Sequence, residues 1–149
     1  MVENKKVLFI CTGNSIRSQM AEGLMGILGA GRWHAQSGGI IPSFVHPLAI
    51  QAMNEIGIDI SHQTSKSLYQ FLNEKFDYII TLCDYAAAAC PSFPGQGKRL
   101  HWSTEDPIGV VGTVEERLVF FRRVRDKIKT RIEKFLKSES SKSSFPPQG

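Results

Sequence analysis

The sequence predicts a single α/β domain with a small four-stranded parallel sheet and helices on both faces of that sheet. Short apolar runs rich in β-forming residues alternate with longer segments whose apolar residues recur at helical spacing. A length of 149 residues, with 42% hydrophobic and 21% charged residues, suits one core of ordinary composition. We expect residues 1–137 to form the domain. Residues 138–149, rich in Ser, Lys and Pro, are expected to be a flexible C-terminal tail.

Four short segments are predicted to be the strands. The first, over residues 6–11, is a continuous apolar run of the kind found in buried parallel strands. The run over 76–82 is the next clearest, because it is rich in aromatic and β-branched residues. Two weaker strands are expected over 34–37, where a pair of glycines closes the strand, and over 100–102.

Helical spacing of apolar residues predicts the helices. The first begins near Arg17 or Ser18 and ends at Gly29, and the second runs from Pro47 to Gly57. A helical turn and a long helix complete the set, over residues 68–71 and 113–136.

The long helix is predicted to bury one apolar face. Its inward residues recur three or four positions apart; they are Leu118, Phe121, Val124, Ile128, Ile132 and Phe135. The segment over 83–94 is instead predicted to be a loop, with room for one helical turn at its alanines.

Composition excludes several classes of function. The formal charge is +4, but the basic residues are spread out, and the densest stretch, over 122–137, is typical of a solvated helix face. We therefore expect no nucleic-acid partner, although a mild positive field would attract a small anion. No apolar run approaches the ~20 residues of a membrane span, and the N-terminus lacks a signal-peptide pattern. The chain is expected to be a cytoplasmic monomer without a membrane partner.

Chemistry is expected at one edge of the sheet. In parallel sheets, ligands bind beyond the carboxyl ends of the strands. Cys11, Cys83 and Asp106 each follow a predicted strand, so they should lie on one rim. Three cysteines in a reducing compartment indicate catalysis, redox chemistry or plain burial rather than a disulfide framework.

The segment from Cys11 to Ser18 predicts an oxyanion site. A loop that leads from a strand into a helix N-terminus points its backbone N–H groups inward and forms an anion nest. The loop residues expected to bind the anion are Thr12, Gly13, Asn14, Ser15, Ile16, Arg17 and Ser18. Arg17 supplies a planar fork for two oxygens of a tetrahedral oxyanion. The same positive field favours a thiolate at Cys11, which would be the nucleophile.

This loop is where a known family can be identified. The pattern Cys-x5-Arg-Ser after a strand resembles the loop of low-molecular-weight tyrosine phosphatases. The longer string Cys-Thr-Gly-Asn-Ser-x-Arg-Ser-Gln-Met-Ala-Glu-Gly, over residues 11–23, resembles the thioredoxin-coupled arsenate reductases, which share that fold. The resemblance covers residues 5–136 and implies a low-molecular-weight phosphatase-like fold. Family members often carry a further cysteine in the loop, where this chain has Ile16.

Cys83 and Cys90 have a spacing that does not suit zinc, and no metal site is predicted from them. The six residues between them lack Gly and Pro, so this segment could coil or extend. By itself the pair could equally be two buried thiols. The string Thr-Leu-Cys followed by Cys-Pro resembles the reductases, and this resemblance implies a redox role for both residues.

Asp106 lies in the string His-Trp-Ser-Thr-Glu-Asp-Pro, which resembles the His-Trp…Asp-Pro loop of the same family. The resemblance implies that Asp106 is the general acid; Asp-Pro alone is a common turn. The related phosphatases have Tyr after this Pro. Ile108 stands there instead, which argues against a phosphotyrosine pocket.

Taken together, the resemblance implies reduction of arsenate by a relay of three thiols. Cys11 would attack arsenate while Asp106 protonates the leaving oxygen, and Cys83 and then Cys90 would resolve the adduct. Thioredoxin would reduce the last disulfide, and no cofactor is expected. Two alternatives stay open: a low-molecular-weight phosphatase that uses Cys11, Arg17 and Asp106, and a non-catalytic oxyanion-binding or redox-sensing protein.

The resemblance also bears on a cation beside the loop. Some family members bind potassium with residues that correspond to Asn14, Glu22, Ser37 and an Asp after the string His-Gln-Thr-Ser. Here that string is followed by Lys66, whose ammonium could occupy the position of the cation. We therefore expect no potassium site.

Overall fold

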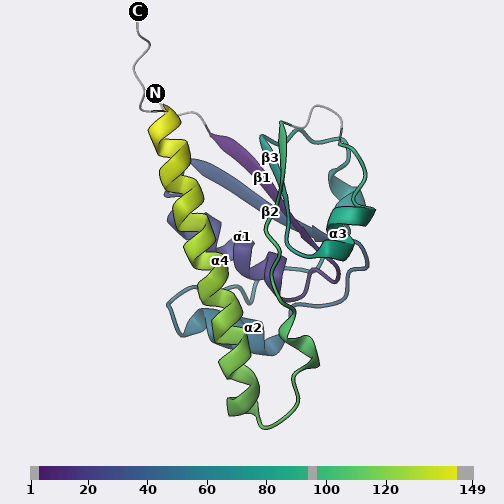
Figure 1. Cartoon of the computed structure of the whole chain (residues 1–149), viewed down its shortest axis with the longest axis vertical. Coiled ribbons are helices and arrows are strands. Elements are labelled where there is room, and N and C mark those ends of the chain that lie inside the picture. Colours follow the sequence, from purple (N-terminus) through teal and green to yellow (C-terminus); the bar gives the residue numbers. More distant parts are fainter. Residues whose placement is uncertain (1–3, 94–96, 144–149) are drawn as a thin grey trace, which may run out of the picture.

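The computed structural model describes residues 4–93 and 97–143. Its four strands form one fully parallel sheet in the order β2-β1-β3-β4 (Figure 1). The strands are β1 (Lys5–Cys11), β2 (Trp33–Gly39), β3 (Tyr78–Thr81) and β4 (Lys98–His101). This sheet confirms the predicted fold class.

Helices cover both faces of the sheet. They are α1 (Arg17–Leu28), α2 (Pro47–Asn54), η1 (Leu68–Phe71), α3 (Asp84–Ala89), η2 (Pro107–Gly109) and α4 (Val114–Ser143). On one face α1 packs beside α4, and Phe135 of α4 meets the rings of Trp33 and Tyr78 at 5.2 Å and 4.9 Å. On the other face η1 lies against β2, since Leu68 contacts the backbone of Gly38. None of the helices that the structure describes is long and apolar enough to cross a membrane.

Burial explains why β1 is continuously apolar after its first two residues, which are lysines. Residues 7–10 are fully inaccessible to solvent, as expected for a central parallel strand covered on both faces. All six inward residues predicted for the C-terminal helix are buried as well.

The second strand is longer than predicted. It continues through Gly38 and Gly39, which were expected to close it. A Cβ at Gly38 would lie 2.9 Å from Leu68 Cα, and one at Gly39 would lie 2.8 Å from the amide nitrogen of Asn14. These glycines therefore allow two backbones to approach the strand closely rather than ending it.

The last helix also runs further than predicted. It ends at Ser143 rather than at residue 136, so residues 138–143 of the expected tail are helical, and 144–149 lie outside the described residues. Tyr78 Oη donates to Glu139 Oε2 at 2.6 Å, which ties this part of α4 to the sheet. Burial and the Glu139 carboxylate raise the pKa of Tyr78 to about 12, so the phenol stays a donor.

Three smaller boundaries differ too. The strand expected over 76–82 is paired only over Tyr78–Thr81, and the one expected over 100–102 begins earlier, at Lys98. The helical turn at the alanines is a complete short helix, α3. Such shifts arise because strand ends depend on where a neighbour pairs, which local sequence does not specify.

Candidate active site

The loop between β1 and α1 directs its carbonyl groups outward. The segment after β2 binds them: Ile41 N–H donates to Thr12 O at 2.8 Å, and His46 N–H donates to Ser15 O at 3.0 Å. The N–H groups of residues 13–16 make no hydrogen bond within the described part of the chain. The first turn of α1 also has no side-chain cap. A cradle of N–H groups at a helix N-terminus is suited to bind an anion.

Asn14 gives the loop its bend. It has φ +47°, in the left-handed region that Asn tolerates, and its side chain is fully buried. Its Oδ1 accepts the backbone N–H of Lys66 at 2.7 Å. Gly13, the preceding residue, does not have a positive φ, and an added Cβ there would make only ordinary contacts.

Cys11 Sγ lies 2.8 Å from Ser18 Oγ at the base of the loop. Asn14 Nδ2 donates to the same Ser18 oxygen at 2.7 Å. Because that oxygen already accepts a hydrogen bond, the Ser18 hydroxyl hydrogen is free to point at the sulfur. Ser18 is therefore placed to donate a hydrogen bond to the Cys11 sulfur.

Two glutamines that the sequence analysis did not single out hold the Asn14 side chain in place through hydrogen bonds. Gln19 Nε2 donates to Asn14 Oδ1 at 2.9 Å and to Thr64 O at 2.9 Å. Gln63 Nε2 in turn donates to Gln19 Oε1 at 2.7 Å. The available signal was a glutamine inside the apolar helix that follows the loop, because a buried amide needs partners.

Arg17 and Asp106 meet at the mouth of the loop. Arg17 Nη2 lies 3.2 Å from Asp106 Oδ2, and Arg17 Nη1 donates to Thr104 O at 3.1 Å. Asp106 Oδ1 accepts the N–H of Ile108 at 3.0 Å, which fixes the carboxyl group at the start of η2. The Arg17 side chain is 7% exposed and that of Asp106 is 42% exposed. The acid is therefore reachable from solvent, while the cation is enclosed.

Ser15 and His46 form the rim beside Arg17. Ser15 Oγ is buried and has no hydrogen-bond partner among the described residues, which suits an added acceptor such as a bound oxyanion. His46 Nδ1 accepts the N–H of Leu48 at 3.1 Å and caps α2. Burial, aided by Arg117, lowers the pKa of His46, so the ring stays a neutral acceptor at neutral pH.

The structure places Cys83 directly beside the loop. Its Sγ lies 3.1 Å from Thr12 Oγ1, and Thr12 is the neighbour of Cys11 in the chain. The same sulfur accepts the N–H of Ala86 at 3.4 Å and so caps α3. Sheet pairing explains this proximity. Ile10 of β1 pairs with Thr81 of β3, so the segments that follow these two neighbouring strands leave the sheet side by side.

Cys90 lies at the other end of α3 and is not brought to the loop. All three cysteines are free thiols, and six helical residues, about 9 Å of rise, separate Cys83 from Cys90. Burial raises the pKa of Cys90, and the charge of Arg99 offsets this only in part. Arg99 also donates to the carbonyls of Cys90 and Pro91. In this conformation the Cys90 thiol is largely buried from solvent and lies apart from Cys83.

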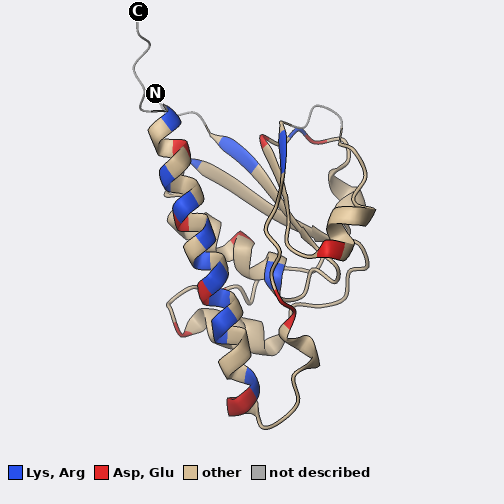
Figure 2. Cartoon of the chain, viewed as in Figure 1, with Lys and Arg blue, Asp and Glu red and all other residues tan. Residues whose placement is uncertain are grey.

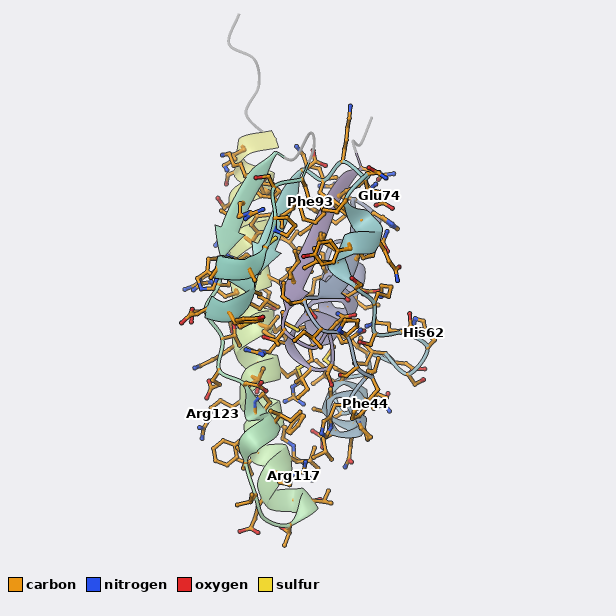
Figure 3. The ribbon with its side chains drawn as sticks, turned by 90° about the vertical axis from the view of Figure 1, so that its right-hand side faces the viewer. Phe44, His62, Glu74, Phe93, Arg117 and Arg123 are labelled. Carbon is orange, nitrogen blue, oxygen red and sulfur yellow. The ribbon has the colours of Figure 1, made fainter. Side chains whose placement is uncertain are left out.

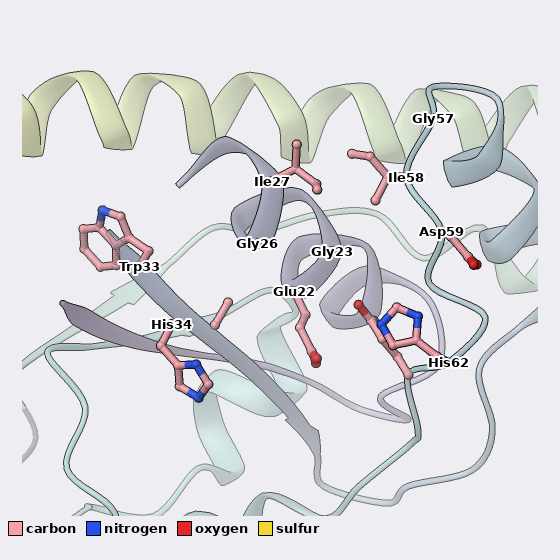
Figure 4. Close-up of a pocket in the computed structure, with 12 residues that line it drawn as sticks. Glu22, Gly23, Gly26, Ile27, Trp33, His34, Gly57, Ile58, Asp59 and His62 are labelled. Carbon is pink, nitrogen blue, oxygen red and sulfur yellow. The ribbon is translucent and has the colours of Figure 1, made fainter. Parts of the chain in front are cut away.

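A lysine ammonium stands beside the loop at Glu22. Lys66 Nζ lies 3.7 Å from Glu22 Oε1 and donates to Thr64 O at 2.8 Å. Ser37 Oγ donates to the same Glu22 oxygen at 2.5 Å and accepts from Asn14. Glu22 also lines a hollow of about 360 Å³ with His62, so ions in solvent can approach its carboxylate (Figure 4).

Because Lys66 supplies a positive charge at Glu22, we expect thermal melts to be the same in potassium chloride and sodium chloride at equal ionic strength. The variant Lys66→Asp removes that charge and adds a carboxylate, so it should gain a melting temperature that rises with potassium by mass action. A potassium-specific rise in the unchanged protein would contradict this assignment.

Three comparisons with known proteins point to the same group of proteins. The family model described as low molecular weight phosphotyrosine protein phosphatase matches residues 6–144. An arsenate reductase of Halalkalibacterium halodurans is 50% identical over 133 residues, which is 89% of this chain and 96% of that protein. A solved arsenate reductase in the phosphate binding state has a TM-score of 0.78 and 41% identity, and the match covers 90% and 98% of the two chains.

A thioredoxin-dependent arsenate reductase of Corynebacterium glutamicum is also similar in structure. Its TM-score is 0.65 at 25% identity, and the match covers 92% of this chain and 64% of that one. Family model, sequence relatives and solved structures agree with one another. The chain therefore belongs to the low molecular weight phosphotyrosine protein phosphatase family and, within it, to the arsenate reductases.

Proposed function

We propose that this chain reduces arsenate to arsenite with Cys11, Cys83 and Cys90 as successive thiols, and that thioredoxin regenerates it. The observation that carries the proposal is the position of Cys83, whose sulfur touches Thr12 at the edge of the anion loop. A hydrolase of this fold would need no second sulfur there, because water resolves its covalent adduct.

The first step forms a bond between Cys11 and arsenic. Arsenate would lie in the N–H cradle, with two oxygens on the Arg17 guanidinium and one near the unpartnered Ser15 hydroxyl. The Cys11 thiolate attacks arsenic, and one oxygen leaves as water after taking a proton from Asp106. Arg17 must exchange its contact with Asp106 for the anion, which frees the acid to act.

The second step reduces the arsenic. The Cys83 thiolate attacks Cys11 Sγ, and the electron pair of the S–As bond stays on arsenic, which leaves as arsenite. Two thiols have then been oxidised to a Cys11–Cys83 disulfide, and arsenic has gained their two electrons.

The last steps restore the loop. Cys90 attacks Cys83, frees Cys11 as a thiolate and leaves a Cys83–Cys90 disulfide. A dithiol protein reduces this disulfide through a mixed disulfide and becomes oxidised itself. We propose thioredoxin for this role and the cytoplasm as the location, since the three free thiols need a reducing compartment. We expect a monomer that acts without nucleic acid or membrane.

A weak phosphatase activity follows from the same geometry, because phosphate and arsenate share shape and charge. It would use Cys11, Arg17 and Asp106 only. Ile108, half exposed beside the acid, offers an aliphatic surface rather than the aromatic one of a phosphotyrosine pocket.

The direct test is an assay that couples arsenate to thioredoxin, thioredoxin reductase and NADPH. We expect NADPH oxidation that depends on both arsenate and thioredoxin, with arsenite formed in equal amount. Hydrolysis of p-nitrophenyl phosphate without arsenate-dependent NADPH oxidation would favour the phosphatase. Anion binding with neither activity would favour a sensor.

A further inference from the structure

A long groove lies between α4 and the segment that follows β4. Its volume is about 930 Å³, and the β4 side contributes Ser103 and Thr104. Figure 1 shows this segment descending between α3 and α4. The α4 side of the groove is basic; the cationic residues used below are Arg123, Lys127, Arg131 and Lys134. Figure 2 shows Lys and Arg following one another along this helix.

The spacing of these residues places them on one face of α4. Arg123, Lys127 and Arg131 are four residues apart, and such residues stack along a helix. These residues therefore form a positive stripe, although Asp126, which pairs with Arg125, also lines the groove. A solvated helix face was the sequence-based interpretation of this region, but the structure shows that the stripe forms the wall of a groove.

Most of this charge is not neutralised by the chain itself. Arg123 lies 4.9 Å from the Phe120 ring and Arg131 5.6 Å from the Trp102 ring, but within residues 4–93 and 97–143 neither they nor Lys134 form an ion pair. Lys127 does bind Glu105, at 2.5 Å. Figure 3 shows Arg123 at the edge of the molecule, away from Phe44 and His62.

The groove extends to the start of α3, the short helix between Cys83 and Cys90. Ser103 Oγ donates to Asp84 Oδ1 at 3.4 Å, and His101 Nε2 lies 2.9 Å from the same oxygen. Asp84 is the first residue of α3 and follows Cys83. A protein seated in the groove would therefore lie next to the segment that carries Cys83 and Cys90.

We infer that this groove docks an acidic surface of the dithiol protein that reduces the Cys83–Cys90 disulfide. The inference rests on the proposed function, which requires a protein reductant at α3. A stable protein contact covers about 800 Å² on each partner, so a partner that reaches α3 must also cover neighbouring surface. Opposite charge there would steer the encounter and raise the association rate.

The experiment compares two triple variants that lose the same charge. The groove variant is Arg123→Gln, Arg131→Gln, Lys134→Gln. The control is Arg32→Gln, Lys75→Gln, Lys98→Gln, whose side chains are exposed and lie before or at the start of strands, at the end of the sheet opposite the site. Arsenate reduction is measured with thioredoxin and, separately, with dithiothreitol, an uncharged dithiol that needs no docking surface.

For the groove variant we expect KM for thioredoxin to rise about ten-fold at low salt and to lose most of its salt dependence. Rates with dithiothreitol should not change, and the control variant should behave like the unchanged protein. An unchanged KM for thioredoxin would overturn the inference. If the triple variant loses activity equally with both reductants, the single variant Arg123→Gln decides, because it removes only a contact with Phe120. A rise in its KM for thioredoxin alone would support the inference. An unchanged KM for thioredoxin in this single variant would overturn it.

The unchanged protein in the same assay tests the proposed function separately. It must reduce arsenate repeatedly with thioredoxin, whether or not the groove binds thioredoxin. Binding to a DNA oligonucleotide or to anionic vesicles, lost in the groove variant while KM for thioredoxin is unchanged, would assign the stripe to another polyanion and overturn the inference.

Discussion

Replacing Cys90 with serine should give an enzyme that releases about one arsenite per molecule and then stops, because no thiol is left to free Cys11. The stalled species should contain a Cys11–Cys83 disulfide. Arsenite counted after rapid mixing and mass spectrometry of the quenched protein would measure both. In multiple turnover with thioredoxin the rate should fall to background.

The variant Cys83→Ser is the matched comparison. It should not form the Cys11–Cys83 disulfide, although arsenate can still enter the loop. Hydrolysis of p-nitrophenyl phosphate should survive both substitutions, because Cys11, Arg17 and Asp106 are intact. Full turnover with thioredoxin in the Cys83→Ser, Cys90→Ser double variant would refute the relay and favour the phosphatase interpretation.

Replacing Cys11 with serine should abolish both activities, with a loss of at least about a thousand-fold. A hydroxyl at neutral pH is a far weaker nucleophile than the thiolate that the proposed first step requires at this position. Arg17→Ala should also abolish reduction by removing the clamp on the anion, and Arg17→Lys should restore little, since it keeps the charge but loses the fork.

These two substitutions need a control that shows the variants are still folded. Thermal melts and circular dichroism should show that Cys11→Ser stays folded, because the replacement is smaller and the surrounding hydrogen bonds can remain. Turnover by Cys11→Ser at a rate near that of the unchanged protein would remove the basis of the whole site.

Much of the site could be predicted because its parts are close in sequence or share one edge of the sheet. The Cys11 loop is a local strand-to-helix turn, and parallel pairing brings Cys83 to it. The position of Lys66 was expected from the family resemblance, which placed a cation ligand after the string His-Gln-Thr-Ser. In contrast, the brace between Gln19 and Gln63 joins segments far apart in the chain, so only tertiary packing could show it.

The same reason explains the errors in the fold. From the local sequence, Gly38 and Gly39 were predicted to end the strand. In the structure they lack a side chain where the backbones of Leu68 and Asn14, from other segments, approach the strand closely. The end of α4 was missed because Glu139 gains its partner from β3. The groove beside α4 depends on how the chain after β4 passes that helix, which no helical periodicity encodes.

The short helix α3 has a consequence for the order of events. The sulfur of Cys83 caps this helix. In the relay that we propose, the same sulfur is the atom that attacks Cys11. Once that sulfur enters a disulfide with Cys11, it is drawn away from Ala86, and a helix of six residues has little intrinsic stability to survive the loss. Unwinding would release Cys90 to come within the roughly 7 Å between Cα atoms that a disulfide requires. In the proposed relay, α3 would therefore keep Cys90 away from Cys83 until the Cys11–Cys83 disulfide has formed, so Cys90 would react only after arsenite has left.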